Sequence, residues 1–436
     1  MSRGEDGLLL MGASSLLTNV QALRAEKEGV REGVDIEAVH QSRVSSRRLR
    51  AGMVIFPECL PARKSRKWMK EIKSVTRALG AARDLDVQIE FLQEFEGTVG
   101  AAARPGLDAI IHLKEKARED VQPSVVRWLE DLEEKGTLQE MEQYLSGMVK
   151  RLDGADIRGE AAHASGLEHI SARIRELLAM EACVPLRDAI EEHHEMRIAA
   201  KHLRYSAEAF RPLFDDRLKK EISTLKGLQD MLGEMHDCDV WMDEGAALAD
   251  ALSSVRDAPA GLSALMDDRR RRRERCYEAF AQQWGALRSS GFFEDLEARF
   301  SDLPGAREGL REARMKELHE LAEAMDVDPP HSRKVTELAL VLYAELKNVH
   351  GLDEADRFIL EAAGMLHDIG WVEGQRGHNR TSRRLILADD RLPLLEGERQ
   401  LVAAVARYHR GRLPREDDLE MKGLSDRQRD GVARMA

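Results

Sequence analysis

Apolar side chains recur every three or four residues along much of this chain, with polar residues between them. Two examples are the runs Leu203, Ala207, Phe210 and Leu225, Leu228, Leu232. Such spacing places the apolar side chains on one face of a helix. Only 12 of the 436 residues are proline, so long helices can continue without interruption. The pattern predicts an all-α fold.

Glycine and proline interrupt this pattern at a few places, which are candidate boundaries. The run Val327-Asp328-Pro329-Pro330 is the sharpest, because it ends one helix and starts another. Weaker clusters occur at 97–106, 154–159 and 303–309. We therefore expect a first domain at 1–300, a linker at 301–325 and a second helical domain at 326–436.

The first domain contains two copies of one sequence pattern, about 154 residues apart. Val39–Phe56 reads VHQSRVSSRRLRAGMVIF, and His193–Phe210 reads HHEMRIAAKHLRYSAEAF. Downstream, Leu79–Val87 (LGAARDLDV) matches Leu232–Val240 (LGEMHDCDV). Because both blocks occur in the same order at nearly the same offset, we predict two related helical bundles, at about 15–150 and 165–300.

Each copy carries a stripe of cations on one helix face. Residues at offsets 0, 3, 7 and 10 fall within an arc of roughly 80° on a helix. The stripes are His40, Arg43, Arg47, Arg50 in copy one and His194, Arg197, Lys201, Arg204 in copy two. Lys73 and its positional match Lys226 extend the basic surface. Arginine and lysine suit rows of phosphate oxygens, and the alternative is a solvated or salt-bridged helix face.

The charge distribution supports a specific anionic ligand. The chain has a net charge of −12, yet Val39 to Arg83 contains 12 Lys or Arg against 2 Asp or Glu. A strongly basic segment inside an acidic chain indicates binding of a polyanion. Nucleic acid is disfavoured, because the chain is acidic overall and the stripes lack interleaved aromatic residues for base stacking. The run at 267–275 (DDRRRRRER) is interpreted as a solvated helix face or a ligand site.

Cysteines and apolar runs add little further chemistry. Four widely separated cysteines predict neither a zinc ribbon nor a disulfide framework. The mildly apolar stretch Leu8–Leu17 is too short to span a bilayer. We expect a cytoplasmic protein without a membrane segment.

The stripes and the downstream blocks resemble those of the CHAD family, the conserved histidine α-helical domain. The pattern H-x-x-R-[VI]-x-x-[RK]-x-L-R occurs twice, each time followed by L-G-x-x-[RH]-D-x-D-V. The resemblance covers roughly residues 15–300 and implies two pseudo-symmetric bundles with a basic groove that binds inorganic polyphosphate through the eight stripe residues. His236 replaces Arg83 in copy two, which leaves its role open. We expect Asp84 and Asp237 to orient neighbouring cations.

The second domain contains four histidines and one aspartate on or beside predicted helices: His331, His367, Asp368, His378 and His409. Imidazole and carboxylate suit Zn, Mn, Fe and related divalent ions. Two such ions would clamp a phosphate and activate water at neutral pH. The alternative is that these histidines cap helices or lie at the edge of a core.

This region is similar to the HD superfamily of metal-dependent phosphohydrolases, in particular the HD-type C-terminal domain of exopolyphosphatase and guanosine pentaphosphate phosphatase proteins. The matching text is LEAAGMLHDIGW, GHNRTSRRLI and VARYHR. The similarity implies that His331, His367 and Asp368 bind a divalent metal (Mn, Mg, Fe or Zn), with His378 and His409 as further ligands. His367 and Asp368 are the implied catalytic residues. The actin-like ATPase portion of that family has no counterpart here.

The similarity also predicts an incomplete metal site. In the resembling family a later helix ends in a Leu-Arg-Ile-Ala-Asp-type run whose aspartate closes the metal shell. Here the corresponding helix starts near Leu424 and the sequence stops at Ala436, so weak metal binding and little hydrolysis are expected. The alternative is a substitute ligand, for which the candidates are Asp417, Asp418 and Asp430.

The leading hypothesis is a polyphosphate-binding protein whose HD-type domain hydrolyses a phosphoanhydride or phosphomonoester. One alternative is a non-catalytic protein that targets polyphosphate granules and has a degenerate HD domain. Another is an HD nucleotide phosphohydrolase regulated by polyphosphate. The sequence leaves open whether the chain is an enzyme, which metal and substrate it uses, and its oligomeric state.

Overall fold

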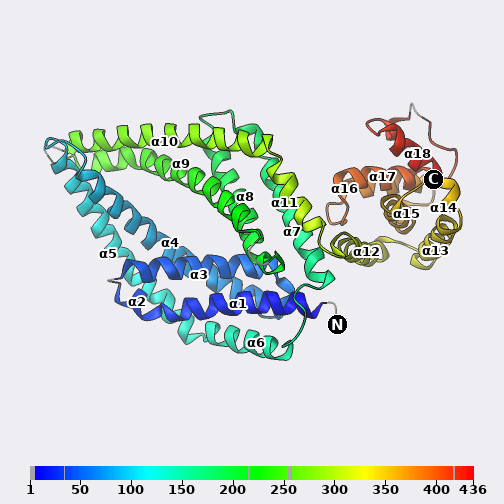
Figure 1. Ribbon diagram of the computed structural model, residues 1–436, viewed down its shortest axis with the longest axis horizontal. Coiled ribbons are helices and arrows are strands. Elements are labelled where there is room, and N and C mark those ends of the chain that lie inside the picture. The colour runs from blue at the N-terminus through cyan, green and yellow to red at the C-terminus, as the bar shows by residue number, and fades with distance from the viewer. Residues whose placement is uncertain (1–4, 34, 215–216, 254, 256–257, 416–417) are drawn as a thin grey trace. The chain divides into compact units, whose positions relative to one another are not determined.

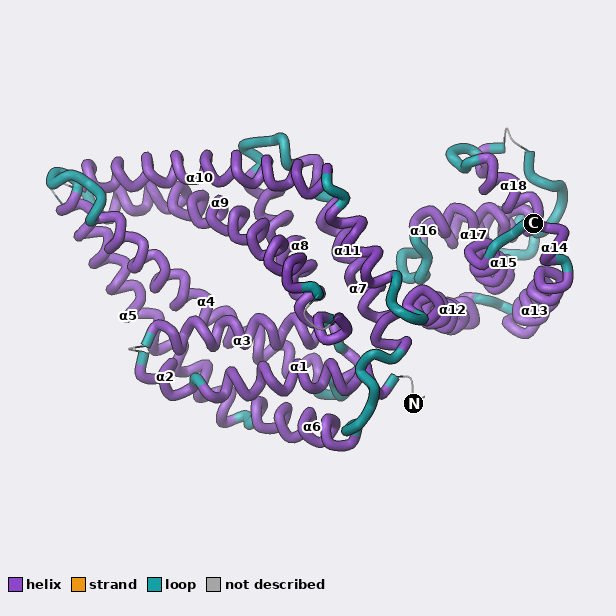
Figure 2. The backbone as a smooth tube through the Cα atoms, in the orientation of Figure 1, coloured by secondary structure: helices purple, strands orange, loops and turns teal. Residues whose placement is uncertain are grey.

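The computed structural model describes residues 5–33, 35–214, 217–253, 255, 258–415 and 418–436. Within these ranges every regular element is a helix and no strand occurs, which confirms the predicted all-α class (Figures 1 and 2). The chain divides into two compact units, Met1–Ala306 and Arg307–Ala436. No helix in the described part of the chain is long and apolar enough to cross a membrane.

The first unit contains eleven α-helices among its described residues. They are α1 Asp6–Ala25, α2 Lys27–Glu32, α3 Ile36–Ile55, α4 Ser65–Glu96, α5 Arg104–Glu134, α6 Thr137–Arg151, α7 Glu160–Leu178, α8 Ile190–Ala209, α9 Lys219–Ala251, α10 Ala258–Ser289 and α11 Phe292–Ser301. The two sequence copies correspond to α3–α5 and α8–α10. In each copy, a long helical hairpin, α4–α5 or α9–α10, follows the helix that carries the cationic stripe (Figure 1).

Equivalent residues of the two copies meet where α3 packs against α8. Phe56 and Phe210, which match in the repeat, are fully buried, with ring centroids 5.5 Å apart. Contact between equivalent residues is expected at a two-fold axis, here a pseudo-two-fold axis within one chain. The repeat therefore brings the two stripe helices together.

The far ends of the two hairpins meet in a second contact, where α5 packs against α10 (Figure 1). A Cβ atom on Gly106 would lie 2.7 Å from the Ala258 carbonyl oxygen, and one on Gly261 would lie 2.6 Å from the Ala103 carbonyl oxygen. Glycine at both positions lets the two backbones approach closely. Apolar side chains, including Leu92 and Trp241, bury this contact.

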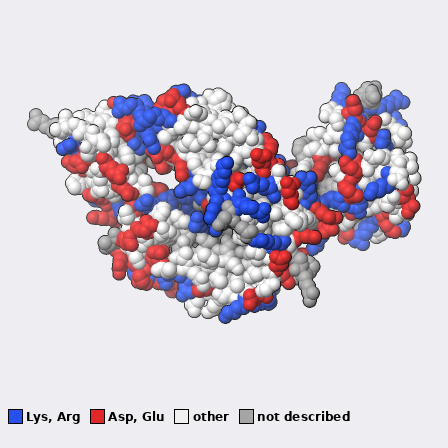
Figure 3. All heavy atoms as spheres, viewed as in Figure 1, with Lys and Arg blue, Asp and Glu red and all other residues white. Residues whose placement is uncertain are grey.

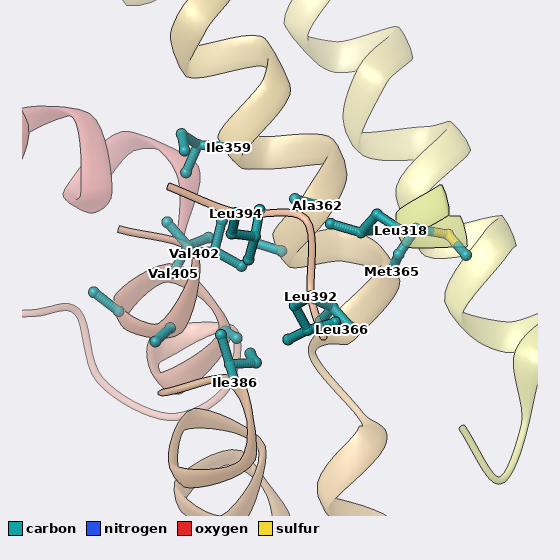
Figure 4. Close-up of a cluster of buried hydrophobic side chains, with 14 of the residues drawn as sticks. Leu318, Ile359, Ala362, Met365, Leu366, Ile386, Leu392, Leu394, Val402 and Val405 are labelled. Carbon is teal, nitrogen blue, oxygen red and sulfur yellow. The ribbon is translucent and has the colours of Figure 1, made fainter. Parts of the chain in front are cut away.

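The second unit is a smaller helical bundle. Its elements are α12 Ala306–Met325, α13 Pro329–Glu345, α14 Lys347–His350, α15 Glu354–Leu366, the short 3₁₀ helix η4 Ile369–Glu373, α16 His378–Ala388, α17 Glu396–Tyr408 and α18 Asp426–Met435. Figure 4 shows the core, to which Ile359 and Leu366 from α15 and Val402 and Val405 from α17 belong.

The linker expected at 301–325 is not one. Most of it forms α12, whose Met315, Leu318 and Ala322 are buried in the core of the second unit (Figure 4). Their spacing of three and four residues gives α12 an apolar face, which it buries against α15. The physical boundary thus lies at Ala306, some twenty residues before the Pro-Pro signal, which starts α13 instead.

Candidate functional site

The two cationic stripes lie on one surface. Arg47 and Arg50 of α3 and Lys201 of α8 line a common pocket of about 270 Å³. Figure 3 shows lysine and arginine side chains gathered where α8 meets α3. The sequence placed each stripe on one helix face, and the contact between α3 and α8 joins the stripes into one basic surface.

The joined stripes repel one another. Burial, and next the charges of Arg47 and Arg197, lower the pKa of Lys201 to about 8. Burial and the neighbouring Arg47 also lower the pKa of Arg50. The buried Arg50 Nε has no hydrogen-bond acceptor among the described residues. Like charges held together at a partly buried surface favour the binding of an anion.

Other stripe residues are partly neutralised by the protein. Arg43 donates from Nη1 to Asp84 Oδ1 over 2.6 Å, which agrees with the expected orienting role of Asp84. Arg204 donates from Nε to Gln229 Oε1 over 2.9 Å and pairs with Glu208. Arg204 is therefore less available to a ligand than its match Arg50.

The remaining predicted positions differ in exposure. His40 is half-buried on α3, whereas Lys73 on α4 and Lys226 on α9 are exposed. His194 Nδ1 lies 3.2 Å from Nδ1 of His236, the residue that replaces Arg83 in copy two. Burial, followed by the charge of Arg197, lowers the pKa of His236 to about 4, so the imidazole is neutral at physiological pH.

The glycine of the downstream block leaves room for an arginine side chain of the stripe. A Cβ atom on Gly80 would lie 4.0 Å from Arg43 Nη2, and one on Gly233 would lie 3.6 Å from Arg197 Nε. The same arginine thus packs over the same glycine in both copies. A larger side chain on α4 or α9 would displace the guanidinium group.

The second aspartate of each D-x-D block holds the hairpins together. Asp86 accepts from Arg118 Nε over 2.6 Å, and its match Asp239 accepts from Arg273 Nε over 2.5 Å. Both aspartates are buried, so the partners compensate charges that would otherwise be costly. Sequence reasoning missed this role, although the recurrence of the second aspartate in both copies was a signal.

The arginine run on α10 is mostly structural. In addition to the Arg273 pair, Arg269 pairs with Asp268, Arg270 with Asp267, and Arg272 with Glu234. This result favours the interpretation of the run as a solvated helix face that forms salt bridges. Arg271 and Arg275 are exposed.

The second unit brings all five predicted metal-site residues together. His331 lies in the first turn of α13, His367 and Asp368 follow α15, His378 begins α16, and His409 follows α17. Four separate helix ends thus position the cluster.

The two carboxylate oxygens of Asp368 face different histidines. Oδ2 lies 3.4 Å from His367 Nε2 and 3.7 Å from His331 Nε2. Oδ1 lies 3.1 Å from His378 Nε2 and 3.6 Å from His409 Nε2. The cluster is therefore two groups of three potential ligands that share one aspartate.

Backbone carbonyls determine which nitrogen of three histidines carries the proton. Nδ1 lies 2.7 Å from the Gly364 oxygen in His367, 2.8 Å from the Gln375 oxygen in His378 and 2.6 Å from the Ala406 oxygen in His409. A carbonyl only accepts hydrogen bonds, so each Nδ1 is the donor. In the neutral form of each ring, Nε2 then presents a lone pair toward Asp368.

This arrangement fits a metal cation. Asp368 Oδ1 is buried and receives no hydrogen bond from the residues described. Lone pairs of nitrogen and oxygen that face one another repel unless a proton or a metal cation lies between them. Atoms bound to one ion at about 2.0–2.2 Å stand about 3.0–3.5 Å apart, close to the separations seen here. Burial also lowers the pKa of His409, which favours the neutral, ligating form.

Two glycines allow the helix ends to converge. A Cβ atom on Gly364 would lie 2.5 Å from Thr336 Oγ1, so glycine permits α15 to approach α13. A Cβ atom on Gly370 would lie 2.2 Å from the His378 carbonyl oxygen. The Gly370 nitrogen instead donates to Ser382 Oγ over 2.9 Å, which ties η4 to α16.

The proposed substitute ligands lie elsewhere or cannot be placed. Asp418 accepts from Tyr408 Oη over 2.8 Å and pairs with Arg412, and these contacts hold the loop after His409. Asp430 is on α18, 3.9 Å from Arg434. Neither belongs to the histidine cluster. Asp417 lies outside the described residues.

Comparisons with known proteins support both halves of this description. A family described as "CHAD domain" matches residues 14–246, and one described as "Ppx/GppA phosphatase, domain III" matches residues 313–436. Together they indicate a protein related to polyphosphate. No curated protein matches the chain.

Two solved structures are similar to part of the chain. The CHAD domain from the plant Ricinus communis is 22% identical, with a TM-score of 0.49, over 64% of this chain and 92% of its own. PptA from Streptomyces chartreusis is 20% identical, with a TM-score of 0.46, over 64% of this chain and 99% of its own.

Proposed function

This chain belongs to the CHAD domain family, and on that basis we propose that it binds inorganic polyphosphate across α3 and α8. The observation that carries the proposal is the meeting of Arg47, Arg50 and Lys201 in one pocket. Within the described ranges none of these three cations has an ion pair. A bound phosphate chain supplies the missing negative charge, with arginine giving directional donors and lysine a point charge.

The test is charge reversal with a matched control. Arg47→Glu together with Lys201→Glu changes the net charge by −4, and so does Arg271→Glu together with Arg275→Glu on the exposed face of α10. The first pair is expected to weaken binding of long-chain polyphosphate at least about tenfold, with steep loss of parent binding as salt rises. The α10 pair is expected to change it little. Equal weakening by both pairs would reduce the effect to net charge and overturn the assignment.

We further propose that the histidine cluster is a metal-dependent phosphohydrolase centre for a phosphoanhydride or phosphomonoester. His331, His367 and Asp368 Oδ2 would hold one divalent ion, and His378, His409 and Asp368 Oδ1 a second. An ion held there supplies a Lewis acid that activates water and offsets phosphate charge. The chain's own part is orientation: the three backbone carbonyls fix the imidazoles, and Asp368 joins the two groups.

Metal uptake and phosphate release test this second proposal. His367→Ala and Asp368→Asn are expected to abolish Mn or Zn uptake and phosphate release from polyphosphate or p-nitrophenyl phosphate. His319→Ala, on α12 and outside the cluster, is the control and is expected to retain both. A parent protein that takes up neither metal, or uptake unchanged in the two cluster variants, would refute the metal centre.

A further inference from the structure

The pocket shared by α3 and α8 changes character along its length. On α3 the lining residues Arg47 and Arg50 are followed one turn later by Val54. On α8 the lining residue Lys201 is followed one turn later by Tyr205. Both helices run in the same direction along their contact, because equivalent residues meet at the cations and again at the phenylalanine pair. The pocket therefore has a cationic end and an apolar end, about one helical turn or 5–6 Å apart. Arg173 and His202 also line it, and both pair with Glu176.

The apolar end is uncovered. The side chain of Val54 is 56% exposed, although Ile55 beside it is buried. Met69 from α4 also lines the pocket and is half-buried. The ring of Tyr205 lies under the guanidinium group of Arg204, 4.6 Å from its centroid, which holds the ring in place. Inorganic polyphosphate offers nothing apolar to cover these groups, since every unit of the chain is a charged phosphate.

We propose that this pocket binds a nucleoside triphosphate. The triphosphate contacts Arg47, Arg50 and Lys201, and the base lies against Val54, Met69 and Tyr205. The whole pocket, cationic end included, has a volume of about 270 Å³, just below the usual range of small-ligand sites, so it encloses only part of the nucleotide. This inference rests on the proposed polyphosphate function, because the same cations hold both ligands. Nucleotide and polyphosphate therefore compete.

Calorimetric titration of the full chain with ATP and with inorganic tripolyphosphate tests the inference. The two ligands carry similar charge, so any preference for ATP comes from the adenosine part. We expect ATP to bind about tenfold more tightly, from burial and stacking of one base. Replacing the apolar end, Val54→Ser with Met69→Ser, is expected to remove this preference and to leave tripolyphosphate affinity within about twofold. Val87→Ser, an exposed valine farther along α4, is the control.

The outcomes separate the two proposals. If tripolyphosphate and long-chain polyphosphate both fail to bind, the polyphosphate function is wrong and the nucleotide site falls with it. If tripolyphosphate binds but ATP binds no more tightly, the nucleotide site alone is wrong. The same conclusion follows if the double serine variant weakens both ligands equally. Displacement of bound ATP by long-chain polyphosphate supports the shared site.

Discussion

The pKa of Lys201 depends on the other cations of the basic surface. Its pKa of about 8, lowered by burial and by Arg47 and Arg197, means that its charge is lost between pH 7 and 9. An ordinary lysine keeps its charge to above pH 10. A bound polyanion raises this pKa again, so binding takes up a proton.

We predict that polyphosphate affinity falls by up to about tenfold from pH 7 to pH 9, because only the charged form of Lys201 attracts phosphate. Lys201→Arg is expected to flatten this profile, since arginine stays charged throughout. Binding titrations at constant ionic strength measure both profiles. A parallel decline in the two proteins would show that another group is responsible.

Gly233 provides a second prediction at the residue scale. A Cβ atom there would meet Arg197 Nε at 3.6 Å, an ordinary contact. Gly233→Ala should therefore keep polyphosphate affinity and stabilise the helix by about 0.5–1 kcal/mol. Gly233→Leu should displace Arg197 and weaken binding. Urea unfolding and binding titrations distinguish these effects, and a leucine variant with parental affinity would contradict the packing role.

At the scale of elements, the crossing of α5 and α10 depends on two glycines. A methyl group on Gly106 would lie 2.7 Å from the Ala258 backbone, so Gly106→Ala is expected to cost about 1–3 kcal/mol of unfolding free energy. Gly285→Ala, on the partner helix α10 and with open space around it, should instead stabilise by about 0.5–1 kcal/mol. Urea denaturation of the two variants measures the contrast. A neutral Gly106→Ala would mean that the hairpin ends separate easily.

At the scale of the whole molecule, the two units have separate cores, and their proposed chemistries use different residues. We predict that Arg47→Glu with Lys201→Glu lowers polyphosphate affinity and leaves metal uptake unchanged. His367→Ala is expected to do the reverse. The combined variant should show both losses. Each change in binding free energy should equal that of the single variant within about 0.5 kcal/mol. A loss of polyphosphate affinity in His367→Ala would show that the units are coupled.

The sequence predicted the elements well where they depend on residues close together in the chain. Helical spacing of apolar residues, the repeat and the histidine positions were sufficient for the all-α class and for the candidate residues. The linker at 301–325 was wrong because the apolar face of α12 was overlooked beside the stronger Pro-Pro signal. The incomplete metal shell stays a prediction.

The sequence by itself determined which helix face carries each cation, since the position of a residue around a helix depends only on its number along the chain. It also determined that imidazoles and a carboxylate recur near helix ends. Only the tertiary structure decided which of these groups are free. It paired Arg43 with Asp84 and Arg204 with Glu208, left Arg47 and Arg50 beside Lys201, and turned the two oxygens of Asp368 toward different histidines. These outcomes depend on contacts between segments far apart in the chain, and no local pattern encodes such contacts.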